Sequence, residues 1–130
     1  MEYLKQYEIL FKKAKSDITA AKILYKEENE FLEIDTILFH LQQFVEKSLK
    51  SLLAYKNVHF PKTHDNEILF TKCSEIGIKF VEKYLELTIL DDYAVEGRYE
   101  DIGESIDNLD EILKLIELLL EEVEEYIYPK

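Results

Sequence analysis

The sequence predicts an all-α protein: an antiparallel, up-and-down bundle of four to five helices, forming one domain over residues 1–130. Long apolar runs recur with helical spacing, and only three glycines and two prolines are present to interrupt them. Hydrophobic residues make up 47% of the chain, so a core can form without support from metals or disulfides.

Two long helices are predicted first, over residues 3–26 and from Phe31 to Lys56. The apolar stripe of the first helix consists of Leu10, Ala14, Ile18, Ala21 and Tyr25. The stripe of the second consists of Ile34, Ile37, Leu38, Leu41, Val45, Leu49 and Leu52. Asp17 falls on the edge of the first stripe, where an acid needs a cation or hydrogen-bond donors.

A turn around Pro61 ends the second helix, because proline cannot continue it and pushes the preceding residue towards extended geometry. Thr63 or Asp65 is expected to cap a short third helix, which runs to about Ser74 and stops at Gly77.

A fourth helical stretch is predicted from Ile78 to Leu90, followed by the longest irregular segment, which contains the only arginine, Arg98. The last helix is expected to begin near Ser105 or Asp107 and to end at about Tyr126. Its apolar side consists of Ile106, Leu109, Ile112, Leu113, Ile116, Leu119, Leu120 and Val123.

Charge is distributed unevenly along the chain. Residues 1–63 contain nine acidic and ten basic side chains, whereas residues 64–130 contain nineteen and six. Nucleic acids are bound mostly by neutralising phosphates, so a chain of net charge −12 is a poor general nucleic-acid binder. Any phosphate contact is expected from a local cationic patch in the first half. The glutamates of the last helix are interpreted as a solvated face.

Three features of the sequence indicate where in the cell the protein is expected. The single cysteine, Cys73, excludes an intrachain disulfide and suits a reducing cytoplasm, and its apolar neighbours favour a buried structural thiol over a nucleophile. No basic start leads into an apolar run, so no signal peptide is predicted. No uninterrupted apolar run reaches the roughly 18 residues of a spanning helix. A cytoplasmic protein without membrane contact is expected.

Metal and cofactor sites find little support. His40, His59 and His64 show neither HxxxH nor HExxH spacing, so no metal ligand set is predicted. The glycines are isolated, which excludes a P-loop and a GxGxxG fingerprint. We therefore expect no cofactor.

A polar stripe on the second helix is the main functional candidate. His40, Gln43, Lys47 and Lys50 recur at steps of three, four and three, which places them on one helix face. One interpretation is a wet surface on which Glu46 and Lys50 form an ordinary i,i+4 ion pair. The other is a working surface of the protein. Spacing alone leaves both open.

A family resemblance favours the working surface. The segment "AAKILYKEENEFLEIDTILFHLQQFVEKSLKSLLAYKNVHFPKTHDNEIL" and the later "YAVEGRYED" resemble the HEPN (higher eukaryotes and prokaryotes nucleotide-binding) domain over roughly residues 10–120. The best-matched pieces are the fH-x-x-Q-x-x-EK-x-x-K-x-LL signature, the FPKTHD turn and the RY pair.

The resemblance implies a helical bundle that usually dimerises, with the functional cleft between protomers. It also implies a small prokaryotic protein, often encoded beside a minimal nucleotidyltransferase and sometimes acting in a toxin–antitoxin pair. Some members are metal-independent ribonucleases that use an R-x(4–6)-H motif. Here "YEDIGES" follows Arg98 and supplies no histidine at that spacing, so the sequence leans away from an enzyme.

Family site residues carry over by position. His40, Gln43, Glu46, Lys47 and Lys50 match the helix signature; His64 and Asp65 match the turn, Arg98 and Tyr99 the RY pair, and Asp17 the acid of the first helix. We expect His40, Lys47, His64 and Arg98 to converge, with Asp17 accepting from Lys47 or Arg98.

Two principal functions follow from this expectation. The first is a homodimeric module that binds a nucleotide or RNA, or partners a nucleotidyltransferase, with Lys47, Lys50, His64 and Arg98 meeting the phosphates and Tyr99 or Tyr93 stacking. The second is a toxin-type ribonuclease that uses His64 or Arg98. A non-catalytic dimeric scaffold is the plainest alternative.

Overall fold

The computed structural model describes residues 4–27, 34–94 and 109–130, and every regular element within these ranges is a helix. In chain order these elements are α1 (Gln6–Lys26), α2 (Ile34–Tyr55), α3 (Asn66–Glu75), the 3₁₀ helix η1 (Lys79–Tyr93) and α4 (Leu109–Ile127). The predicted all-α bundle and the order of its helices are therefore confirmed. The expected start of the last helix and the segment around Arg98 lie outside the described residues.

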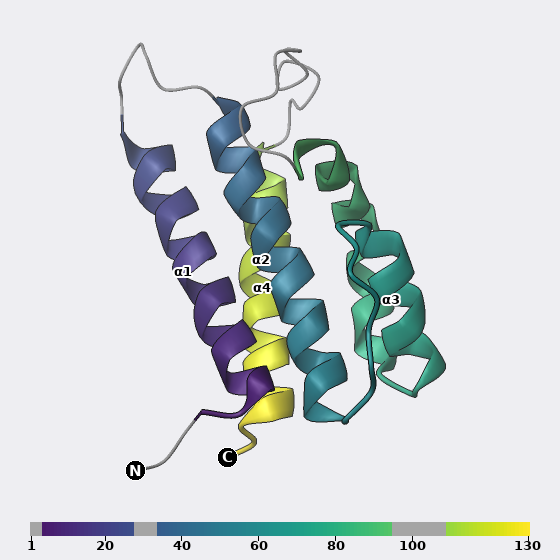
Figure 1. The fold of residues 1–130 in the computed structure, drawn as a ribbon. Helices are drawn as coiled ribbons and strands as arrows, with labels where there is room; N and C mark the ends of the chain where they lie inside the picture. The colour runs from purple at the N-terminus through teal and green to yellow at the C-terminus, as the bar shows by residue number, and fades with distance from the viewer. Residues whose placement is uncertain (1–3, 28–33, 95–108) are drawn as a thin grey trace.

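The helix α2 is the centre of the bundle. It contacts α1, α3, η1 and α4, and none of its residues between Thr36 and Tyr55 is exposed. Figure 1 shows α1 and α2 side by side and antiparallel, with α3 and η1 on the other side of α2. A polar side chain on α2 is therefore held between neighbouring elements rather than surrounded by water.

Most of the predicted core is buried as expected. The six positions of α2 from Ile37 to Leu52 in the predicted stripe are at most 4% exposed, and Cys73 is fully buried. Two predictions were wrong. Ile34, the first residue of α2, is 37% exposed, and Tyr25, whose hydroxyl donates to Asp110 of α4, is 41% exposed. Phe11 is 1% exposed and belongs to the core of α1 instead.

The second residue after α2 and the second residue after α3 both adopt the left-handed conformation. Asn57 has φ 58° and Gly77 has φ 94°, and these are residue types that adopt this conformation readily. The next amide then reaches back into the helix, from Val58 to the Leu53 carbonyl and from Ile78 to the Cys73 carbonyl. At the start of α3 the Asp65 carboxylate accepts from the amides of Glu67 and Ile68, which confirms one of the two predicted caps.

The helix predicted from Ile78 to Leu90 is present, but its hydrogen bonding is of the 3₁₀ type and it extends to Tyr93. Its buried residues are spaced every three positions: Ile78, Val81, Tyr84, Leu87, Leu90 and Tyr93. In an α-helix each step of three would turn this stripe back by about 60°, so the stripe would wind around the helix. A 3₁₀ helix has three residues per turn and keeps all six on one side.

None of the described helices combines the length and the apolar character that crossing a bilayer requires.

Candidate functional site

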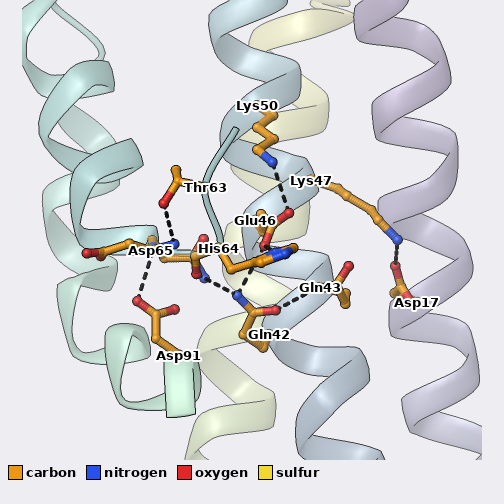
Figure 2. Close-up of polar contacts among 11 residues, drawn as sticks. Asp17, Gln42, Gln43, Glu46, Lys47, Lys50, Thr63, His64, Asp65 and Asp91 are labelled. Carbon is orange, nitrogen blue, oxygen red and sulfur yellow. Dashed lines mark hydrogen bonds and ion pairs between the residues drawn. The ribbon is translucent and has the colours of Figure 1, made fainter. Parts of the chain in front are cut away.

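The four residues of the predicted stripe lie on one face of α2, and all four are partly buried rather than exposed. This face is flanked by α1 on one side and by the loop between α2 and α3 on the other, as Figure 2 shows. Two buried carboxylates, Asp17 of α1 and Glu46 of α2, bind the basic side chains of the face. The wet-surface interpretation therefore does not describe its geometry.

The first carboxylate belongs to Asp17, which is 8% exposed. Its Oδ1 accepts from Nδ1 of His40 at 2.9 Å, and its Oδ2 accepts from Nζ of Lys47 at 2.6 Å. These two donors are seven residues apart on α2, so both reach the facing surface of α1. The expected contact between Asp17 and Lys47 is thus present. The buried carboxylate of Asp17 has the hydrogen-bond donors that burial requires.

The second carboxylate belongs to Glu46, which is 4% exposed. Its Oε2 accepts from Nζ of Lys50 at 3.0 Å, and its Oε1 accepts from Nδ1 of His64 at 2.9 Å. Gln42 adds a longer contact, from Nε2 to Oε1 at 3.3 Å. The i,i+4 ion pair predicted from the sequence is therefore present, but it is buried and shared with a histidine from the loop.

Gln42 ties the loop to α2. Its Nε2 also donates to the carbonyl oxygen of His64 at 3.0 Å, and its Oε1 accepts from Nε2 of Gln43 at 2.7 Å. Gln42 is fully buried, and the sequence reasoning missed it. The available signal was a glutamine flanked by apolar positions of α2, because such a residue needs hydrogen-bond partners inside the protein.

Asp91 of η1 fixes the same loop from the opposite side, and it was also missed. Its Oδ2 accepts from the amide of Asn66 at 2.8 Å, immediately after His64 and Asp65. Burial raises the pKa of the Asp91 carboxyl to about 6, although the amide contacts act in the opposite direction. In the part of the chain that the structure describes, its Oδ1 has no hydrogen-bond partner.

The loop also has internal support, since Oγ1 of Thr63 accepts from the amide of Asp65 at 3.0 Å. The backbone around His64 is consequently held by α2, by the α3 cap and by η1, while its ring contacts Glu46 and its side chain remains 64% exposed. Its Nδ1 is engaged by Glu46, which leaves Nε2 as the atom that a ligand can reach.

The predicted convergence is met only in part. His40 and Lys47 meet at Asp17, whereas His64 joins Lys50 at Glu46, so the residues form two carboxylate–histidine–lysine sets. We call these the Asp17 set (Asp17, His40, Lys47) and the Glu46 set (Glu46, His64, Lys50). Gln43 lies between them in Figure 2. The predicted site residues Arg98 and Tyr99 lie outside the described residues.

Two further residues belong to neither set. His59 is exposed and stacks on Phe60. Tyr93 is 3% exposed, which rules out the stacking face predicted for it. Among the residues that the structure describes, no three His, Cys, Asp or Glu side chains are grouped as metal ligands would be.

Comparison with known families identifies the fold to which these sets belong. The family model for the HEPN domain matches residues 7–126. The chain belongs to the HEPN domain family. The matched range extends from α1 to the last turns of α4, so both carboxylate–histidine–lysine sets lie within the HEPN domain. No similar protein was found among curated proteins, and none was found among solved structures.

Proposed function

We propose that this HEPN domain binds nucleotides through the polar face of α2 formed by the Asp17 set, the Glu46 set and Gln43. The observation that carries the proposal is that two buried carboxylates hold two histidines and two lysines in fixed positions on one face. Imidazolium and ammonium groups suit phosphate oxygens, and the Gln43 amide suits a base or sugar. Donors that are already ordered lose little entropy when a ligand binds.

A thermal-shift experiment with a panel of nucleoside triphosphates tests this proposal. A ligand that binds only the folded protein at 100 times its Kd adds about 2.7 kcal/mol to the free energy of unfolding. We expect His64→Ala and Gln43→Ala to abolish the shift. His59→Ala is the matched control, because His59 is exposed and belongs to neither set; its ring stacks on Phe60, over which Nζ of Lys50 lies. The absence of a shift with every triphosphate would contradict nucleotide binding.

The resemblance to dimerising HEPN domains supports a homodimer, and a minimal nucleotidyltransferase is the partner that it implies. Light scattering coupled to size-exclusion chromatography measures the first. Co-purification with the product of a neighbouring gene for a small nucleotidyltransferase tests the second. A monomer that passes through the column unchanged at high concentration would remove the dimer from the proposal.

A second candidate function is metal-independent cleavage of RNA, favoured by the contact between Glu46 and His64. A carboxylate that engages Nδ1 orients an imidazole so that Nε2 can exchange a proton with a substrate. The sequence lacks a histidine at the family spacing after Arg98, so we rank this candidate second. Incubating cellular RNA with the wild type, His64→Ala and Arg98→Ala decides it, since cleavage that both variants lose would establish the activity.

A further inference from the structure

The lysines of the two sets are already neutralised. Lys47 lies 2.6 Å from Asp17 and Lys50 lies 3.0 Å from Glu46, and their side chains are 25% and 14% exposed. Because each lysine pairs with one carboxylate, the two pairs together contribute no net charge. A phosphate that approaches this face therefore gains little attraction from the lysines unless another group adds positive charge.

His40 and His64 are the groups that can add positive charge to this face. Each uses Nδ1 to contact a carboxylate oxygen, and a carboxylate only accepts, so each Nδ1 carries a hydrogen. In the neutral ring Nε2 then presents a lone pair, which does not bind a phosphate oxygen. In the protonated ring Nε2 becomes a charged donor while the Nδ1 contact is kept.

We propose that His40 and His64, rather than Lys47 and Lys50, supply the charge that captures a nucleotide phosphate, so that binding requires protonated imidazole and weakens as pH rises. Asp17 and Glu46 act as positioning residues that direct each Nε2 towards the ligand. This inference rests on the proposed nucleotide-binding function and adds the condition under which the site is active.

The charged groups around each imidazole ring are consistent with binding that weakens as pH rises. His40 faces Asp17 of α1 and Lys47 of α2. His64 faces Glu46 and Lys50 of α2. Asp65 is next to it in the loop, and Asp91 of η1 accepts from the amide of Asn66. Asp91 has a pKa of about 6 and loses negative charge as pH falls. Its titration adds to the effect and needs its own control.

Calorimetric titration with ATP, without magnesium, at pH 6 and pH 8 tests the inference. We expect the wild type to bind about tenfold or more tightly at pH 6, the factor that one charge-assisted hydrogen bond supplies. A phosphate monoester takes up a proton near pH 6, which weakens its own binding. Tighter binding at pH 6 must therefore come from the protein.

Variants separate the contributing groups. His40→Gln and His64→Gln should each lower the affinity at pH 6 and flatten the pH dependence, whereas His64→Lys, which is charged at both pH values, should restore affinity at pH 8. His59→Gln should retain the pH dependence of the wild type, and Asp91→Asn should lose only the smaller part that Asp91 adds. Circular dichroism melting of each variant distinguishes loss of binding from loss of fold.

The outcomes are distinguishable from those of the proposed function. ATP binding that is equal at pH 6 and pH 8, or that Lys47→Met weakens while His64→Gln does not, overturns the inference and leaves nucleotide binding standing. No binding of ATP at either pH, with no shift for any triphosphate in the panel, overturns both.

Discussion

Nδ1 of His64 lies 2.9 Å from Oε1 of Glu46, although 18 positions of the chain separate the two residues. The contact joins an exposed ring to a carboxylate that is almost inaccessible to water. It also brings the loop before α3 onto the face of α2. The candidate site is therefore assembled by tertiary structure and not by one helix alone.

Removal of the Glu46 carboxylate should destabilise the fold. In Glu46→Ala, Lys50 is left largely buried without a counter-ion, and we expect the free energy of unfolding to fall by about 3 kcal/mol. Urea denaturation measures this quantity. Glu82→Ala, which breaks an exposed pair with Lys79, is the control and should cost no more than about 1 kcal/mol. Equal losses in the two variants would show that burial of Glu46 is unimportant.

Asp91 should make stability depend on pH. Its pKa is raised from 3.8 to about 6, so the folded protein binds this proton more tightly than the unfolded chain does. Its stabilising contribution is therefore complete below about pH 4 and is lost as pH rises through 6. We expect a loss of about 1–2 kcal/mol, allowing for partial solvent screening. Asp91→Asn should remove this slope from denaturation measured between pH 4 and 7, while Asp92→Asn, at an exposed neighbouring residue, should retain it.

The spacing of three residues in η1 predicts opposite outcomes for two leucines two positions apart. Leu87 is fully buried and Leu85 is 46% exposed. Leu87→Ala should lower the free energy of unfolding by about 3 kcal/mol, whereas Leu85→Ala should change it by about 0.5 kcal/mol. Chemical denaturation of the two variants compares them directly. A larger loss of unfolding free energy in Leu85→Ala than in Leu87→Ala would show that the side of η1 carrying Leu85, and not that carrying Leu87, packs in the core.

Cys73 should be unreactive in the folded protein. It is fully buried, and burial raises the pKa of its thiol to about 12, so almost no thiolate is present near neutral pH. A thiol reagent such as dithionitrobenzoate at pH 8 should react only as fast as the protein unfolds. Reaction within seconds in native buffer would contradict this, and full reaction in urea provides the reference.

The sequence was sufficient to predict the helices and most of the core, because helical periodicity is a local property. Leu41 and Leu49 were expected in the core for this reason, and both are fully buried. The cap by Asp65 followed equally from local chemistry. The 3₁₀ character of η1 was not predicted, although the regular spacing from Ile78 to Tyr93 was visible in the sequence.

The candidate site was predicted only in part, for a different physical reason. Asp17 was identified because an acid on an apolar stripe needs a partner, and Lys47 is that partner. The pairing of His64 with Glu46 could not follow from spacing, since it depends on how the loop returns to α2. Asp91 acts from a third element and has no motif, so only the folded chain reveals its role.

The enclosure of α2 also determines how this protein should exchange its amide hydrogens. A helix that contacts four other helices releases its amides to solvent only in the largest opening events, whereas peripheral helices open more readily. The backbone under His40, Gln43 and Lys47 should therefore be among the last to take up deuterium. A ligand would meet a surface that exists before it arrives, and fraying of the outer helices would leave that surface intact.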